Sequence, residues 1–151
     1  MFKKILFKLT SSAVLLFFFI NVYSCCAFKT DPPDLRLTSQ SFPSQVRNGQ
    51  RFDLRFTVGN FSNTDCDAET TKQGVVNLKM IKDSIVTQVN NTETLNNLED
   101  SQTQEFFFSV LIEGQGVNGL YELIFVIDPN NTTGDAYREN NTFTSTVTVV
   151  Q

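Results

Sequence analysis

The sequence predicts an all-β fold, an antiparallel sandwich of about seven strands. Residues 142–149 alternate strictly between a face that carries Phe143, Val147 and Val149 and a face made of threonines. A period of two with one apolar face is typical of a half-buried antiparallel strand. Clusters of turn-forming residues recur at short intervals, and no long segment has the period of an amphipathic helix.

The predicted core follows from strands that alternate between apolar and polar residues. Residues 34–41 and 51–58 are expected to form the first two strands, with a turn at Pro43, Asn48 and Gly49 between them. The second strand alternates most cleanly, so that one of its faces is core and the other meets water. The same alternation along the chain predicts these inward residues: Leu35, Leu37, Phe52, Leu54, Phe56, Val58, Leu78, Met80, Phe106, Phe108, Val110, Tyr121, Leu123, Phe125, Ile127, Phe143, Val147 and Val149.

Two further strands are expected at residues 75–82 and 85–89, joined by a short turn. Residues 90–100 carry too few apolar side chains for a packed helix. Leu95 and Leu98 in that segment are suited to cover one end of the core.

Residues 104–112 and 120–127 are apolar on both faces, which is typical of central strands or of strands with a covered outer face. A contiguous exposed apolar patch marks a surface for a partner. We therefore predict a binding surface on the second face of these strands, made of Phe107, Leu111, Ile124 and Val126. The alternatives are that residues 90–100 cover this face, or that the strand register is shifted.

The N-terminal residues have the order of an export signal. Lys3, Lys4 and Lys8 precede an apolar segment, which is followed by small residues and two cysteines. The uninterrupted apolar run spans only residues 13–20, whereas a membrane-spanning helix needs about 20 apolar residues. We therefore expect no permanent transmembrane anchor.

Residues 22–25, Val-Tyr-Ser-Cys, resemble a bacterial lipobox, apart from the tyrosine. The resemblance implies cleavage before Cys25 and lipidation of that cysteine, which would anchor the protein stably in a membrane. The expected organisation is a signal peptide at 1–24, a lipidated tether at 25–33 and one sandwich domain at 34–151. The alternative is ordinary cleavage after Ala27, which would leave a secreted or periplasmic soluble protein.

Charge and composition exclude several function classes. Removing residues 1–24 removes three lysines and no acid, which changes the net charge from −4 to −7. A chain with this negative net charge lacks the basic surface that nucleic-acid binding requires. The chain also has no histidine, which excludes Ser-His and Cys-His nucleophiles and histidine metal sites. The loop acids Asp65, Asp67 and Glu69 have no apolar pocket beside them, so we expect no catalysis.

The three cysteines do not form a recognisable disulfide framework. With Cys25 lipidated, Cys26 remains on the tether and Cys66 lies in a polar loop. We expect Cys66 to be a free thiol, because a bridge to Cys26 would pin the domain to its own membrane anchor. That bridge remains the alternative, since an exported protein can form disulfides.

Short motifs along residues 32–150 resemble the cell-adhesion-related domain found in bacteria, CARDB. They are Pro33-Asp34-Leu35, the asparagine-containing turn at 58–63, the leucine-led turn at 98–101, Gly119 with Tyr121, and Asp128-Pro129-Asn130-Asn131 with Asp135 and Asn140-Asn141. Ser62 and Asp100 stand where that family usually has glycine, and Arg138 where it often has an acid. The resemblance implies an immunoglobulin-like or fibronectin-III-like sandwich and a non-catalytic interaction role, with no particular ligand.

The loop after residue 127 also has the oxygen-bearing residues of a calcium loop. The candidate ligands are Asp128, Asn130, Thr132, Asp135 and Glu139. However, the glycine lies one place late, Pro129 stiffens the entry, and strands flank the loop. Asp and Asn that bond their own backbone in a turn explain more of the pattern. We therefore expect no cofactor, with Ca²⁺ as the alternative.

The sequence thus predicts a non-catalytic, lipid-anchored protein of the bacterial cell envelope with an adhesion or protein-interaction module. The alternatives are a periplasm-facing accessory or structural subunit of an envelope complex, and a calcium-binding module. Cys26 follows the lipidated cysteine in place of the aspartate that retains lipoproteins at the inner membrane in some bacteria. The outer membrane is therefore the expected location, and the partner a protein or surface ligand.

Overall fold

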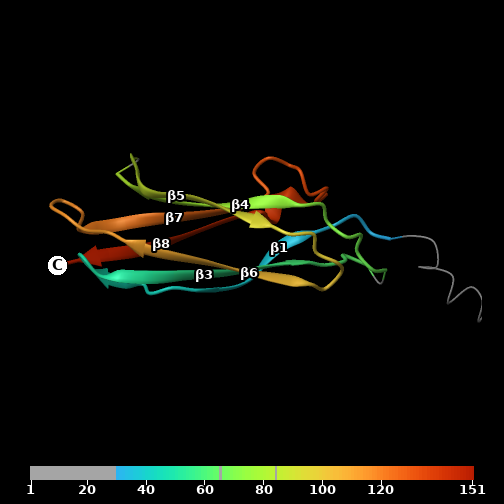
Figure 1. The fold of residues 1–151 in the computed structure, drawn as a ribbon, viewed down its shortest axis with the longest axis horizontal. Coiled ribbons are helices and arrows are strands. Elements are labelled where there is room, and N and C mark those ends of the chain that lie inside the picture. The colour runs from blue at the N-terminus through green and yellow to red at the C-terminus, as the bar shows by residue number, and fades with distance from the viewer. Residues whose placement is uncertain (1–29, 65, 84) are drawn as a thin grey trace, which may run out of the picture.

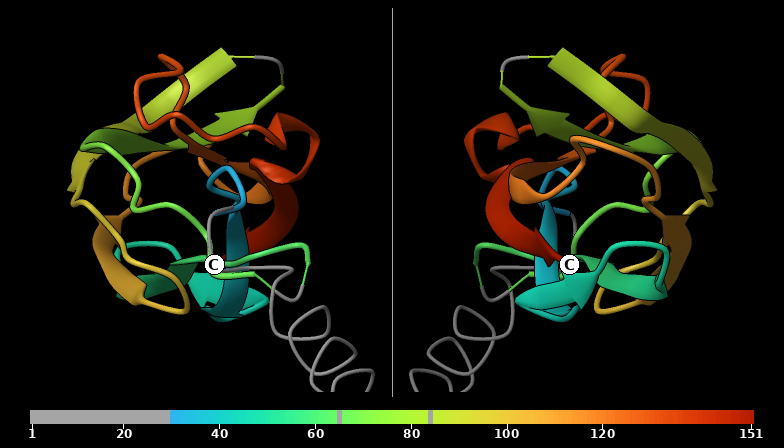
Figure 2. Two further views of the ribbon diagram at one scale, coloured as in Figure 1. Left: turned by 90° about the vertical axis from the view of Figure 1, so that its right-hand side faces the viewer. Right: turned by 90° about the vertical axis from the view of Figure 1, so that its left-hand side faces the viewer.

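The computed structural model of the protein describes residues 30–151, except 65 and 84. In these residues the chain forms eight β-strands and one short 3-10 helix, and the strands make two sheets that pack face to face (Figures 1 and 2). The predicted signal peptide and the predicted lipidation site at Cys25 lie outside the described residues. Within this part of the chain, no helix is long and apolar enough to cross a membrane.

The smaller sheet contains β1 (Leu35–Ser41), β3 (Arg51–Asn60) and β6 (Thr103–Leu111) in the order β1-β3-β6. Both of its pairings are antiparallel. The antiparallel sandwich expected from the alternation is therefore confirmed for this layer. Its central strand, β3, is the one with the cleanest alternation in the sequence.

The larger sheet has the order β2-β8-β7-β4-β5. Its strands are β2 (Gln45–Arg47), β4 (Gly74–Lys82), β5 (Ile85–Leu95), β7 (Gly119–Ile127) and β8 (Thr142–Val150), and the 3-10 helix η1 (Arg138–Asn140) precedes β8. The pairings are antiparallel except that of β2 with β8, which is parallel. The chain changes sheet repeatedly, so long connections must close both ends of the sandwich.

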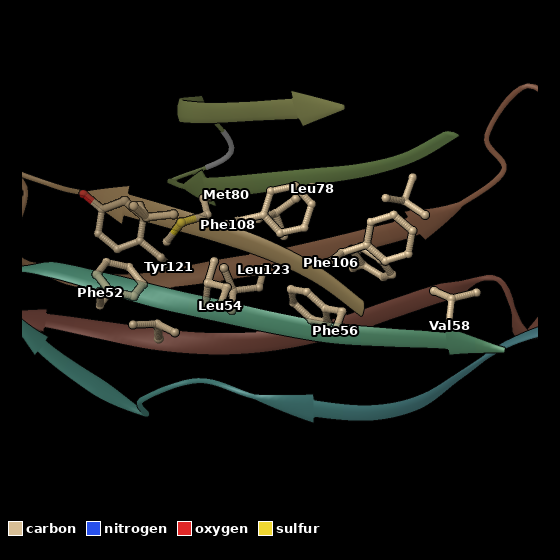
Figure 3. Packing of buried hydrophobic residues seen from close by; sticks show 14 of the residues in the cluster. Phe52, Leu54, Phe56, Val58, Leu78, Met80, Phe106, Phe108, Tyr121 and Leu123 are labelled. Carbon is tan, nitrogen blue, oxygen red and sulfur yellow. The ribbon is translucent and has the colours of Figure 1, made fainter. Parts of the chain in front are cut away.

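The core lies between the two sheets and is rich in phenylalanine (Figure 3). All the residues predicted to point inward are buried, except Leu37 and Phe143, which are partly buried and pack against the core. At its centre Phe56 of one sheet stacks on Phe125 of the other, with ring centroids 4.3 Å apart and planes 7° from parallel. Such aromatic contacts add to the burial of apolar area that stabilises the fold.

Two strands differ from the expectation. The turn expected between β1 and β3 contains the short strand β2, which contributes one buried side chain, Val46, and is too short to show a period. Strand β5 continues to residue 95 instead of ending at 89. Residues 91–94 are exposed, so this part of the edge strand is ordered by its backbone pairing with β4. The predicted burial of Leu95 and Leu98 is confirmed.

Candidate functional site

Polar side chains close one end of the sandwich. This is the end at which residue 30 enters the domain, on the right in Figure 1. The side chain of Asn60, at the end of β3, is fully buried. Its Oδ1 accepts the backbone N–H of Asp34 at 3.1 Å, and its Nδ2 donates to the carbonyls of Glu69 at 2.8 Å and Leu98 at 3.0 Å. One amide therefore joins the start of β1, the loop after β3 and the connection between β5 and β6.

Asp34 is the second junction at this end and is 2% exposed. Its Oδ1 accepts the amide of Asn140 at 2.8 Å. Its Oδ2 accepts the amide of Asn63 at 2.7 Å and pairs with the guanidinium of Arg36 at 3.1 Å. The carboxylate thus joins the start of β1 to η1 and to the loop after β3.

Asp128, the first candidate calcium ligand, is fully buried at the end of β7 with a left-handed φ of 45°. Its Oδ1 accepts the N–H of Thr132 at 2.9 Å and the hydroxyl of that residue at 3.0 Å. Its Oδ2 accepts the N–H of Thr133 at 3.0 Å and the hydroxyl at 2.7 Å. Burial by itself raises the pKa of Asp128, but these four hydrogen bonds outweigh it and hold that pKa below 3.8.

The other candidate ligands are not gathered around Asp128. Asn130 and Glu139 are exposed, and the hydroxyl of Thr132 donates to Asp128. Asp135 accepts the N–H of Tyr137 at 2.9 Å and the amide of Asn141 at 2.7 Å. Burial raises the pKa of Asp135 above 3.8 against these hydrogen bonds, and the charge of Asp34 adds to the rise. In the described residues, no three His, Cys, Asp or Glu side chains are arranged to hold a metal ion.

The four apolar residues predicted as a patch lie on opposite sides of the molecule. Phe107 and Leu111 belong to β6 in the smaller sheet, whereas Ile124 and Val126 belong to β7 in the larger one. Their outward faces therefore look away from each other, and the single patch expected from the sequence is not formed. The two strands are neighbours in sequence, but the connection between them crosses from one sheet to the other.

Phe107 is the more prominent of these side chains, at 50% exposed. It lies opposite Arg55 of β3, whose guanidinium carbon is 5.1 Å from the ring centroid. Ile124 and Val126 are half-buried. Leu120 of β7, which is 61% exposed, was not predicted as part of a surface patch. The alternation of that strand nevertheless places it on the same face as Ile124.

Cys66 is not the free thiol that we expected from the sequence. It is disulfide-bonded and 8% exposed, in the loop that follows β3. The second cysteine of this bond lies outside the described residues. The same loop pairs with the start of the domain, because Asp31 and Ala68 form a parallel β-bridge. The last residues of the predicted tether therefore pack against the domain, with Asp31 and Pro33 buried.

Comparisons with known proteins agree with this architecture. The sequence matches the CARDB family over residues 32–145. The crystal structure of a CARDB domain from Pyrococcus furiosus, in complex with di-metal ions, is similar with a TM-score of 0.60 and 18% identity, over 84% of this chain and 97% of that one. The solution structure of the same domain is similar with a TM-score of 0.55 and 17% identity, over 80% and 98% of the chains.

A β-glucosidase from Listeria innocua in complex with glucose is also similar, with a TM-score of 0.52 and 14% identity, over 79% of this chain. The matching part is only 16% of the length of that enzyme. At such identities these likenesses concern the fold alone. No curated protein sequence matches this chain significantly.

Replacing Asn60 by alanine should lower the free energy of unfolding by about 3 kcal/mol, because three hydrogen bonds are lost and buried backbone groups are left unpaired. Urea denaturation measures the loss. The matched control is Asn130→Ala, an exposed asparagine in the 128–141 loop, which should cost less than about 0.5 kcal/mol. Equal losses in the two variants would contradict the role assigned to Asn60.

Acid should affect Asp128→Asn and Asp135→Asn in opposite ways. The lowered pKa of Asp128 stabilises the fold above the unfolded-state pKa, and this contribution is lost as the pH falls through the folded-state pKa. Asp135→Asn instead removes a carboxyl with a raised pKa, whose protonation stabilises the fold as the pH falls.

Between about pH 6 and pH 3, Asp128→Asn should therefore lose less stability than the wild type, and Asp135→Asn more. Urea denaturation at both pH values measures the two differences. Parallel pH profiles of all three proteins would contradict the assignment.

Proposed function

Because the chain belongs to the CARDB family, we propose that it is a lipid-anchored, non-catalytic envelope protein whose sandwich binds another protein or a surface ligand. The family is one of non-catalytic modules. The buried carboxylates in the described residues support this proposal, since Asp34, Asp128 and Asp135 each hold loop segments together. The hydrogen bonds of these carboxylates thus stabilise the loops that close the domain.

The observation that carries the binding role is the half-exposed ring of Phe107 on the open face of the smaller sheet. Large aromatic side chains that become buried on association supply much of the binding energy of protein interfaces. Strand β3 presents Arg51 and Arg55 on this face, and β6 presents Ser109 and Leu111 beside the phenylalanine. The face therefore offers an apolar centre with polar groups around it, as interfaces do.

The groups around Phe107 are available to a partner. The ion pair between Arg55 and Glu105 is long, at 3.9 Å, and both side chains are more than half exposed. Such a pair contributes at most about 1 kcal/mol, and so does an exposed cation–π contact. A partner could therefore displace both contacts at little cost and use the guanidinium itself.

The crystal structure of the Pyrococcus furiosus domain is in complex with di-metal ions, whereas in this chain the loop after β7 is proposed to serve as a turn. Both carboxylate oxygens of Asp128 already accept two hydrogen bonds each, from the backbone and hydroxyls of Thr132 and Thr133. A cation at this place would have to break bonds that close the loop. The hydrogen bonds of Asp128 therefore favour a role in closing the turn over the alternative of calcium binding.

Replacing Cys25 by alanine should move the protein from the membrane fraction to the soluble fraction, because the thioether to the lipid can no longer form. Immunoblots of fractionated cells measure the distribution. Ala27→Ser is the matched control, since it leaves the residues of the lipobox intact. A Cys25→Ala protein that stays with the membrane would contradict the lipid anchor.

A photoreactive p-benzoylphenylalanine in place of Phe107 should form a covalent adduct with the partner in living cells, and one in place of Thr144 should not. Thr144 is exposed on the outer face of the larger sheet and is the matched control. Denaturing gels of irradiated cells measure the adducts. Equal adducts at both positions, or an adduct at Thr144 alone, would contradict the assigned face. Protease digestion on intact cells then distinguishes an outward-facing adhesin from a periplasm-facing subunit.

A further inference from the structure

Strand β6 forms one edge of the smaller sheet, and no strand pairs with its outer side in the part of the chain that the structure describes. Its nine residues pair with β3 in one unbroken register, without a bulge. The strand contains no proline and no lysine, two residue types that protect edge strands from pairing with another chain. The outer side of β6 is therefore a regular template for a further strand.

The backbone groups that face this open edge belong to the residues with exposed side chains. The N–H of Asn60 in β3 donates to the carbonyl of Gln102 at 3.1 Å, and its carbonyl accepts the N–H of Ser101 at 2.8 Å. Backbone groups alternate in direction along a strand, so the even-numbered residues of β3 and β6 bond to each other. The N–H and carbonyl groups of the exposed, odd-numbered residues in 105–109 therefore point away from β3.

The open part of the edge begins after Gln104. The side-chain amide of Gln104 donates to the carbonyl of Thr94 at 2.8 Å and accepts the N–H of Asn96 at 2.8 Å. These contacts tie the start of β6 to the end of β5. Within the described residues, no hydrogen bond joins the rest of β6 to the larger sheet.

The charges beside this edge balance. Strand β3 presents Arg51, Asp53 and Arg55 on the outer face, and β6 presents Glu105. The chain without residues 1–24 carries a net charge of −7, so two copies of it repel each other. A contact made through this face adds no net charge to that repulsion.

We propose that the partner of the Phe107 face is a second copy of this chain, and that the two β6 strands pair antiparallel about a two-fold axis. This inference rests on the proposed function, because it names the partner of the surface assigned there. In a two-fold contact the same strand meets itself in the reverse direction, so every contact occurs twice. The two smaller sheets then continue into each other, as in other complexes formed by strand addition.

The charges also select the register of the pairing. We place Glu105 of one copy opposite Phe107 of the other, whose ring lies 5.1 Å from the guanidinium carbon of Arg55. Residues directly opposite each other have Cβ atoms about 5 Å apart, so Glu105 of the second copy reaches Arg55 of the first. The 3.9 Å ion pair within each chain is thereby replaced by one between the chains. The backbone groups that meet in this register all face the open edge, so they exchange hydrogen bonds in pairs.

Charge reversal provides the test. Arg55→Glu brings two carboxylates together in a pair of identical copies, and Glu105→Arg brings two guanidinium groups together. Each variant alone should associate at least about 10-fold more weakly than the wild type, because like charges across an interface are costly. A mixture of the two variants should form a mixed dimer, since opposite charges then meet at both contacts. Sedimentation of the full-length protein in detergent measures the association.

The mixture separates the interface from the fold. Both variants lose the ion pair between residues 55 and 105 of their own chain, and mixing cannot restore it. Recovery of the dimer only in the mixture therefore reports a contact between copies. Wild-type association of each variant alone, or a mixture that stays monomeric, would overturn the pairing.

A backbone variant gives a second measurement. Ser109→Pro removes an N–H that faces the open edge and leaves the hydrogen bonds to β3 in place. It should weaken the dimer, whereas the matched Ser109→Ala, which keeps this N–H, should leave the dimer intact. A Ser109→Pro protein that melts at the temperature of Ser109→Ala and associates as strongly would overturn the use of this edge.

Crosslinking in living cells separates this inference from the proposed function. With p-benzoylphenylalanine in place of Phe107, the expected adduct contains two copies of the chain and only peptides of this protein. An adduct with a different protein would overturn the second copy as the partner and leave the Phe107 face as the binding surface. The absence of any adduct at residue 107 would overturn that face, and this inference with it.

Discussion

The fold depends on the buried amide of Asn60, which joins the start of β1, the loop after β3 and the connection between β5 and β6. In a sandwich whose chain changes sheet repeatedly, the connections at each end carry backbone groups that lose contact with water. Those groups need partners, because an unpaired buried N–H or carbonyl costs about as much as a lost hydrogen bond. Asn60 and Asp34 supply the partners at one end, so the two sheets keep a defined relation to each other.

The same use of polar residues is seen in the loop after β7, whose many oxygen atoms resemble those of a calcium loop. The carboxylate of Asp128 accepts four hydrogen bonds from Thr132 and Thr133, which fold the loop back on the end of β7. Asp tolerates the left-handed backbone that this return requires. Three of the side chains that the motif suggests as ligands, those of Asp128, Thr132 and Asp135, are thus engaged in hydrogen bonds that close the loop.

Because the interior is filled and the polar end is closed, we propose that the domain binds its partner through an outer face. The interior is filled by phenylalanines that stack between the sheets, including the pair Phe56 and Phe125. The outer face of the smaller sheet keeps one half-exposed aromatic ring, Phe107, beside weakly held charges. At the polar end, the β-bridge between Asp31 and Ala68 holds the start of the domain against the loop that contains the disulfide-bonded Cys66.

The sequence by itself determined which side chains point inward, because alternation along a strand is a local property of the backbone. It therefore predicted the phenylalanine core and the turn role of Asp128. Only the tertiary structure decided which sheet each strand joins, so Phe107 and Ile124 came to lie on opposite faces. The contacts of Asn60 and the bonded state of Cys66 were decided in the same way. Each depends on residues distant in sequence, and no local period records such a contact.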